Sequence, residues 1–205
     1  MNKPRLWIAH VAYAAATGRL RQLYDRIKGP GDTIDNIMLA HSLRPHTMEG
    51  HMTLYRQVLH HTANRVPKPV LEMLGVYVSL LNACAYCVEH HFAGLERLLG
   101  DDAAAATFVA AARADDGFAG FPQRQRSAFA YARTLTRDPG GVAEEQVVAM
   151  RAAGWSDGEI LEINQVIAYF AYANRTVLGL GVTTDGDVLG LSPSGNEDPN
   201  DWSHR

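Results

Sequence analysis

The sequence predicts an all-α protein, because its apolar residues recur with the period of a helix. In several segments they stand three and four residues apart, as one face of a helix requires; one example is Met48, Met52, Tyr55 and Leu59. No segment sustains the alternation of apolar and polar residues, rich in β-branched and aromatic types, that marks a strand. We therefore expect strands to be minor at most.

The same periodicity predicts nine helices, at 15–28, 34–41, 47–63, 69–81, 84–99, 102–114, 122–136, 143–153 and 157–178. Pro67 and Pro69 suit the start of the fourth helix, because a proline lacks the N–H that the first turn leaves unpaired. Gly154 is placed to end the eighth helix. Ser156 and Glu159 then have the spacing of a capping box, which predicts the start of the ninth.

Length and composition fit a single globular domain, which we expect to span 1–191, followed by a polar tail at 192–205. The formal net charge is −3, and no basic face dominates, so we expect neither a nucleic-acid nor a membrane partner. No run of 18 apolar residues suggests a membrane span. The apolar stretch at 6–16 loosely imitates a secretory leader but contains His10 and Tyr13; we expect a cytoplasmic protein.

The two cysteines of the chain lie three residues apart, in the run Cys84-Ala-Tyr-Cys87. On a helix this spacing makes them neighbours, close enough to cycle between dithiol and disulfide. If Asn82 caps the helix, both thiols lie in its first turn, where the helix dipole favours a thiolate. His91 follows Cys87 by one turn and can accept its proton, so we expect Cys87 to attack and Cys84 to resolve.

Glu72 is a further candidate, but only if the chain folds back on itself. In one continuous helix the spacing of twelve positions from Glu72 to Cys84 would separate them by about 18 Å. In an antiparallel helical hairpin that turns near 79–83, Glu72 would lie beside His91 and relay its protons. Glu159 stands at the same distance before Ala171, a spacing consistent with two related helical repeats in one core.

Other interpretations of these residues need no redox chemistry. Two cysteines and a histidine on an apolar face are also compatible with a buried core. A structural zinc site normally has four ligands, and there is no second cysteine pair, so we expect no metal and no cofactor. His41, His46 and His51 recur every five residues, which scatters them around a helix, and we expect them at the surface or at an entrance.

The spacing from Glu72 to Cys84, Cys87 and His91 resembles the signature of the alkylhydroperoxidase D-like proteins, in the peroxidase-related branch of the carboxymuconolactone decarboxylase superfamily. The likeness extends over about 14–191. It implies the all-helical alkylhydroperoxidase D-like fold, a homo-oligomer (a trimer or a hexamer of paired trimers), and a thiol peroxidase in which Glu72 and His91 serve the two thiols. The best-studied members carry a histidine where this chain has Tyr86, and a phenol with a pKa near 10 is a poorer proton acceptor.

The sequence therefore predicts a thiol-dependent (alkyl hydro)peroxidase, with a Cys84/Cys87 redox pair and a His91/Glu72 proton relay. Its substrate would be a small hydroperoxide, and an external dithiol would reduce it. The lipoyl dithiol that serves the best-studied members is not assumed for this chain. The alternatives are a non-redox lyase resembling carboxymuconolactone decarboxylase, in which the cysteines are dispensable, and an oligomer that senses oxidation without turnover.

Overall fold

The fold was taken from a computed structural model of the chain, which describes residues 5–193 and 202–204. Across these residues the chain is helical, and the one β-type pairing is an isolated bridge between Pro193 and His204. The described residues form nine α-helices: α1 (Gly18–Ile27), α2 (Asn36–Ala40), α3 (Pro45–Tyr55), α4 (Lys68–Leu81), α5 (Ala85–Leu99), α6 (Asp102–Ala114), α7 (Gln123–Arg137), α8 (Glu144–Ala152) and α9 (Asp157–Leu180).

The predicted all-α class is confirmed, and each predicted helix occurs with boundaries that differ by three residues or fewer. The third predicted helix is α3 continued by a π-helical turn, η3 (Arg56–His60). The capping box expected before α9 is also present: the Ser156 hydroxyl accepts from the Glu159 amide, and the Glu159 carboxylate accepts from the Ser156 amide.

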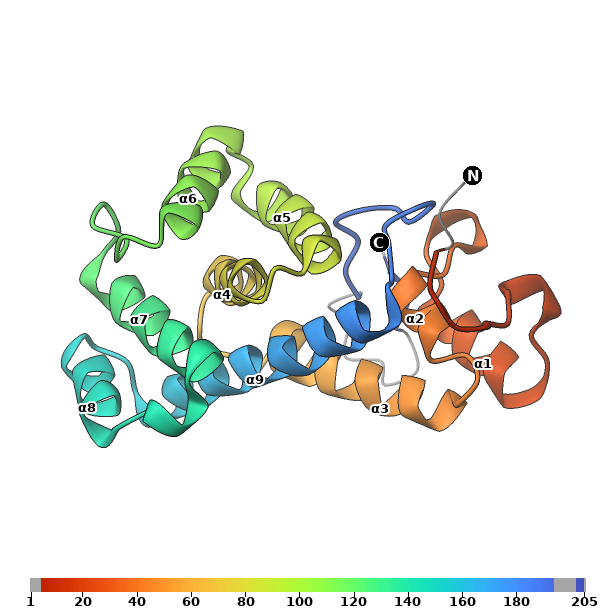
Figure 1. Cartoon of the computed structure of the whole chain (residues 1–205), viewed down its shortest axis with the longest axis horizontal. Coiled ribbons are helices and arrows are strands. Elements are labelled where there is room, and N and C mark those ends of the chain that lie inside the picture. Colours follow the sequence, from red (N-terminus) through yellow and green to blue (C-terminus); the bar gives the residue numbers. More distant parts are fainter. Residues whose placement is uncertain (1–4, 194–201, 205) are drawn as a thin grey trace.

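Helix α4 is the centre of the fold, and it packs on α5, α7 and α9 (Figure 1). Every residue from Val70 to Ser79 is buried, as expected for a helix that is apolar on nearly all sides. Helix α9 runs along the molecule, from the end that carries α8 to the end that carries α1 and α2. This long helix therefore connects the α6–α8 end to the N-terminal segments.

The chain reverses direction between α4 and α5, which is the hairpin that the sequence interpretation required. Ala83 has a positive φ of 55°, and the Cys84 amide donates to the Ser79 carbonyl at 2.9 Å. Asn82 does not cap α5, contrary to expectation: it is the C-cap of α4, and Cys84 occupies the N-cap of α5. The Asn82 side chain instead donates to Asn174 on α9 at 2.9 Å, which ties the turn to the core.

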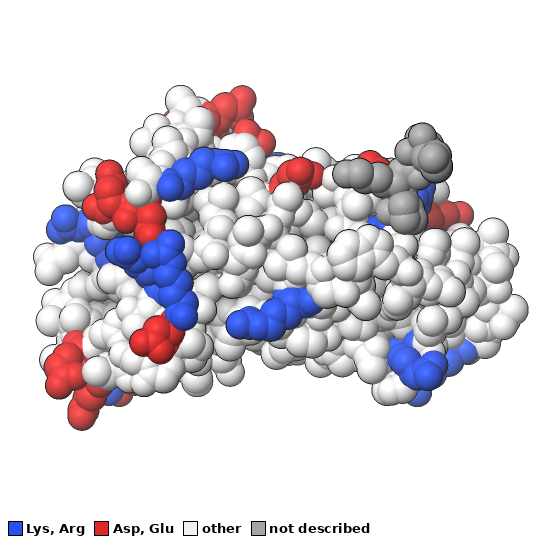
Figure 2. Space-filling view, in the orientation of Figure 1, with Lys and Arg blue, Asp and Glu red and all other residues white. Residues whose placement is uncertain are grey.

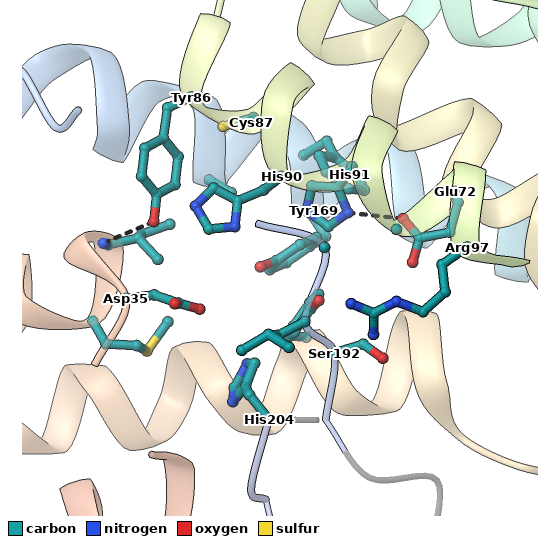
Figure 3. A pocket seen from close by; sticks show the side chains of 18 of the residues that line it. Asp35, Glu72, Tyr86, Cys87, His90, His91, Arg97, Tyr169, Ser192 and His204 are labelled. Carbon is teal, nitrogen blue, oxygen red and sulfur yellow. Dashed lines mark hydrogen bonds and ion pairs between the residues drawn. The ribbon is translucent and has the colours of Figure 1, made fainter. Parts of the chain in front are cut away.

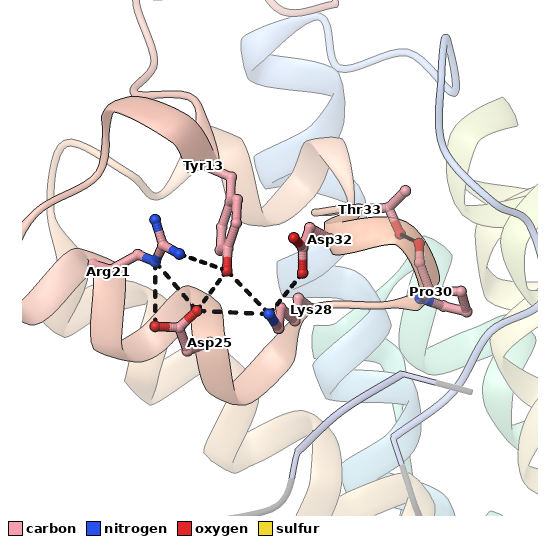
Figure 4. Close-up of polar contacts among 7 residues, drawn as sticks. All are labelled: Tyr13, Arg21, Asp25, Lys28, Pro30, Asp32 and Thr33. Carbon is pink, nitrogen blue, oxygen red and sulfur yellow. Dashed lines mark hydrogen bonds and ion pairs between the residues drawn. The ribbon is translucent and has the colours of Figure 1, made fainter.

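A polar cluster at the surface orders the chain before α2 (Figure 4). The Tyr13 hydroxyl donates to Asp25 at 2.6 Å and accepts from Lys28 at 3.0 Å, and Lys28 in turn contacts Asp32 at 2.6 Å. These contacts raise the pKa of Lys28, with the hydrogen bond to Asp32 as the largest cause. The cluster holds the loop that leads to Asp35, a residue of the cavity described below.

The described end of the C-terminal tail packs on α1. The Trp202 amide donates to the Arg26 carbonyl at 3.2 Å, and the His204 ring lies 2.8 Å from the Ile27 carbonyl. Both side chains are buried. The rest of the tail expected at 192–205, namely 194–201 and 205, lies outside the described residues.

The surface shows no dominant charge on the face seen in Figure 2. Acidic and basic side chains are gathered together at the end that carries α6, α7 and α8, and the middle of this face is mostly uncharged. Within the described ranges, the helices include none with the length and apolar character needed to cross a bilayer.

Candidate active site

The two cysteine sulfurs are in contact in the interior. The Sγ atoms of Cys84 and Cys87 lie 2.6 Å apart and are hydrogen-bonded, and both cysteines are buried free thiols. Cys84 is at the N-cap of α5 and Cys87 follows in the first turn, so the helix geometry brings the sulfurs together. A disulfide between them would require little backbone movement.

The pKa values of the two thiols are shifted in opposite directions. The hydrogen bond with Cys87 lowers the pKa of Cys84, whereas burial raises the pKa of Cys87 well above its usual range. Cys87 nevertheless lines the cavity described below. The thiol that meets a small molecule thus keeps its proton at rest, and that proton has to leave before Cys87 can act as a nucleophile.

Glu72 and His91 form a buried carboxylate–imidazole pair. Glu72 Oε2 lies 2.8 Å from His91 Nδ1, and the carboxylate side chain is 4% exposed. A proton on Nδ1 donates to the carboxylate and leaves Nε2 as an acceptor. The Phe170 ring stands edge-on to the imidazole, with centroids 4.6 Å apart, and fixes its orientation. The α4–α5 hairpin therefore brings together the two residues that the sequence separates by nineteen positions.

A cavity of about 80 Å³ connects these groups (Figure 3). A single water needs roughly 10–15 Å³ of such space, so the cavity has room for several waters or for a small ligand. Cys87, His91 and Glu72 all line it. Among the described hydrogen bonds, none joins His91 to Cys87, so a water or a ligand oxygen is needed to carry a proton between them.

The cavity wall also includes His90, which forms a second carboxylate–imidazole pair, with Asp187, that sequence analysis missed. The Asp187 Oδ2 atom lies 3.1 Å from His90 Nε2 and accepts from the Tyr86 hydroxyl at 2.9 Å. Burial raises the pKa of Tyr86 well above its usual value, so this residue is a neutral hydrogen-bond donor. The spacing of His90, three residues after Cys87, was a usable signal; Asp187 lies in a loop after α9, and no spacing pointed to it.

The expectation for the scattered histidines was wrong in two of three cases. His46 is exposed, but His41 and His51 are buried: the His51 ring packs against Tyr169 and Tyr172 of α9, and the His41 ring packs against His51. His51 lines the cavity and lies 3.3 Å from the Tyr169 hydroxyl. Burial lowers its pKa to about 3, so the ring is neutral at physiological pH. Within the described part of the chain, no group of three or more His, Cys, Asp or Glu residues is arranged to hold a metal ion.

Solved structures similar to this chain carry the same helical architecture. An alkylhydroperoxidase AhpD-core, peroxidase-related protein of Ralstonia eutropha JMP134 is 22% identical, over 91% of this chain and 95% of that one, with a TM-score of 0.76. A peroxidase-related protein of Silicibacter sp. TM1040 is 24% identical, over 76% and 78% of the two chains, with a TM-score of 0.68. The debrominase Bmp8 is 16% identical, over 82% and 84%, with a TM-score of 0.63.

These likenesses show that the chain has the alkylhydroperoxidase D-like helical fold. No family model matches the sequence, and no curated protein sequence matches it. Bmp8 has also been solved as a cysteine-to-alanine variant in complex with 2,3,4-tribromopyrrole. Proteins that share the architecture are therefore described under more than one activity, and the assignment for this chain depends on its own site.

Proposed function

We propose that the protein is a thiol-dependent peroxidase that reduces a small hydroperoxide. The observation that carries the proposal is the contact of two free sulfurs at 2.6 Å, one of which lines a cavity shared with the Glu72–His91 pair. A nucleophile, a resolving thiol and a proton acceptor are what reduction of an O–O bond by a dithiol requires.

In the proposed reaction His91 accepts the proton of Cys87 through a bridging water or the substrate oxygen, and the Glu72 carboxylate stabilises the imidazolium. The Cys87 thiolate attacks the terminal oxygen of the hydroperoxide, the O–O bond breaks, and the alcohol leaves after taking up a proton. Cys87 is then a sulfenic acid. The Cys84 thiol condenses with it to a disulfide and releases water. An external dithiol returns the pair to the reduced form by thiol–disulfide exchange.

A single-turnover oxidation experiment distinguishes the roles of the two cysteines. One equivalent of ethyl hydroperoxide should remove two thiols from the reduced protein and form an intramolecular disulfide. Cys84→Ser should instead stop at a sulfenic acid at Cys87, which dimedone traps and mass spectrometry detects. Cys87→Ser should not react. A Cys87→Ser variant that still consumes peroxide at the unmodified rate would remove Cys87 from the proposed role.

Turnover distinguishes an enzyme from a sensor. With excess dihydrolipoamide or dithiothreitol, a peroxidase consumes many equivalents of peroxide, whereas a redox sensor stops after one. A lyase that does not use the thiols would leave both cysteines reduced and would be unaffected by either cysteine substitution.

Reductive debromination is a second candidate, favoured by the likeness to Bmp8 and by the aromatic wall that Tyr55, Tyr169 and Phe170 contribute to the cavity. The same dithiol would replace a carbon–bromine bond with carbon–hydrogen, releasing bromide and one proton and forming the disulfide. Release of bromide from 2,3,4-tribromopyrrole by the reduced protein, with no peroxide consumption, would favour this function over the first.

We also propose that the protein acts as a homo-oligomer, a trimer or a hexamer. Leu161 and Tyr172 are exposed and lie eleven residues apart, on one side of α9, which suits a contact between copies. Light scattering coupled to gel filtration measures the assembly, and a monomer at micromolar concentration would contradict the proposal.

A further inference from the structure

Asp35 places a carboxyl in the same cavity, where no hydrogen bond or ion pair from the described residues holds it. The residue precedes α2 and lines the cavity together with Cys87 and His91. Figure 3 shows its carboxylate directed into the cavity, below His90. Among the described hydrogen bonds and ion pairs, none involves this side chain, although its backbone carbonyl accepts from Met38 and Leu39.

Asp35 occupies the N-cap of α2 but does not cap it. Aspartate is a preferred N-cap residue because its carboxylate can accept from the free amides of the first turn. Here the side chains of other residues accept the hydrogen bonds from these amides. The Asn36 amide donates to both oxygens of Asp187, at 3.1 and 3.0 Å, and the Ile37 amide donates to the Tyr86 hydroxyl at 3.2 Å. The Asp35 carboxyl is therefore left for the cavity.

The surroundings of Asp35 favour its neutral, protonated form. Burial raises the pKa of this carboxyl, and the nearby Asp187 carboxylate raises it further. His204, His90 and His91 act in the opposite direction, but burial is the largest cause. A carboxyl whose pKa is raised towards the working pH is suited to donate a proton.

We propose that Asp35 donates the proton that the leaving oxygen needs when Cys87 attacks the hydroperoxide, an inference that rests on the proposed thiol peroxidase function. The sulfur–oxygen bond forms as the O–O bond breaks, and the alkoxide oxygen takes the Asp35 proton to become the alcohol. Asp35 is left as a carboxylate. The proton that His91 accepted from Cys87 then moves through the cavity to the Asp35 carboxylate, so the first step is balanced.

This assignment gives the cavity two proton-handling sites with different tasks. The Glu72–His91 pair removes the proton from the thiol, and Asp35, which comes from a different segment of the chain, delivers one to the leaving group. Both sites line the space that the substrate occupies. The Asp187–His90–Tyr86 group is a positioning group, because it caps α2 and so sets where Asp35 stands.

The test compares two oxidants of nearly equal size whose leaving groups differ. Ethyl hydroperoxide expels ethoxide, which is strongly basic and needs a proton, whereas peracetic acid expels acetate, which does not. Single-turnover thiol loss is measured for the unmodified protein, Asp35→Asn, Asp35→Glu and the exposed control Asp102→Asn. We expect Asp35→Asn to slow the reaction with ethyl hydroperoxide by about 100-fold. Its reaction with peracetic acid should stay within about threefold of the unmodified rate, and Asp35→Glu should recover part of the lost rate.

The pH profile gives a second measurement that does not depend on the variant. With ethyl hydroperoxide the rate should fall at alkaline pH as Asp35 loses its proton, and this decline should be absent with peracetic acid. The other titratable and charged groups that line the cavity come from several elements: His51 and Tyr55 of α3, Lys68 and Glu72 of α4, Tyr86, Cys87, His90, His91 and Arg97 of α5, Tyr169 of α9, and His204 of the tail. Asp187, in the loop after α9, adjoins them. Titration of these groups affects the reactions with both oxidants. Only a fall in rate that occurs with ethyl hydroperoxide and not with peracetic acid therefore supports the role of Asp35.

The possible failures are distinguishable. If the unmodified protein loses no thiol to either oxidant, the peroxidase function itself is wrong. If it reacts with both, but Asp35→Asn lowers the two rates equally or lowers neither, the function stands and the role of Asp35 is overturned.

Discussion

The contact between Gly75 and Phe170 links the packing of α4 on α9 to the geometry of the candidate site. A Cβ atom at position 75 would lie 2.2 and 2.3 Å from the Cζ and Cε2 atoms of Phe170. The same ring stands edge-on to His91, at a centroid distance of 4.6 Å. Gly75→Ala therefore tests whether this close approach is needed both for stability and for the position of the imidazole.

The expected change in the free energy of unfolding of Gly75→Ala is the sum of two opposing effects. A normal contact needs at least 3.4 Å, so the fully buried ring has to move by more than 1 Å. Overpacking of this kind typically costs about 1–3 kcal/mol. Alanine is better than glycine inside a helix by about 1 kcal/mol, which offsets part of the cost. We expect the free energy of unfolding to fall by about 1 kcal/mol.

Urea denaturation measures this change, with Gly50→Ala as the matched control. Gly50 lies within α3, is exposed, and has no atom within 4 Å of the place that a methyl group would take, so alanine there should stabilise by up to about 1 kcal/mol. Phe170→Leu removes the ring edge, and the double variant should be more stable than the sum of the single effects predicts. A Gly75→Ala protein as stable as Gly50→Ala, with no coupling to Phe170, would refute the reasoning.

Three further outcomes are expected. Glu72→Gln should slow thiol oxidation by about 100-fold at neutral pH, since the imidazolium at His91 loses its counter-charge; an unchanged rate in a single-turnover assay would exclude the relay. Asn174→Ala should lower the free energy of unfolding by about 1–3 kcal/mol, because it leaves the buried Ser79 and the half-buried Asn82 without their hydrogen-bond partner; a urea midpoint equal to that of the unmodified protein would contradict this. His51 stays neutral in the folded protein down to about pH 3 but takes up a proton near 6.5 when unfolded, so stability should fall as pH drops, by about 1.4 kcal/mol per unit between 6 and 4. His51→Gln should flatten that dependence, and denaturation curves with parallel pH trends for both proteins would count against it.

Much of the fold was predictable because the positions of the helices depend on local sequence patterns. The apolar spacing of α3 and α9 and the Ser156–Glu159 capping box act within a few residues of the chain, and the predicted helices occur nearly where expected. The hairpin between α4 and α5 was predictable only conditionally. Glu72 and His91 could meet if the chain turned near Ala83, and the positive φ at that residue is a conformation that alanine rarely adopts and that neighbouring contacts hold in place.

The thiol pair and its histidine could be found from their spacing on α5, because neighbours on one helix are set by its geometry alone. Asp35, Asp187 and His204 could not be found this way. They come from the loop before α2, the loop after α9 and the C-terminal tail. Asp35 and His204 line the cavity, and Asp187 contacts His90 beside it, because α9 carries the end of the chain back beside α1 and α2. A side chain that enters a site across such long sequence separations leaves no periodic signal, since its position depends on how distant helices pack and not on its neighbours in the chain.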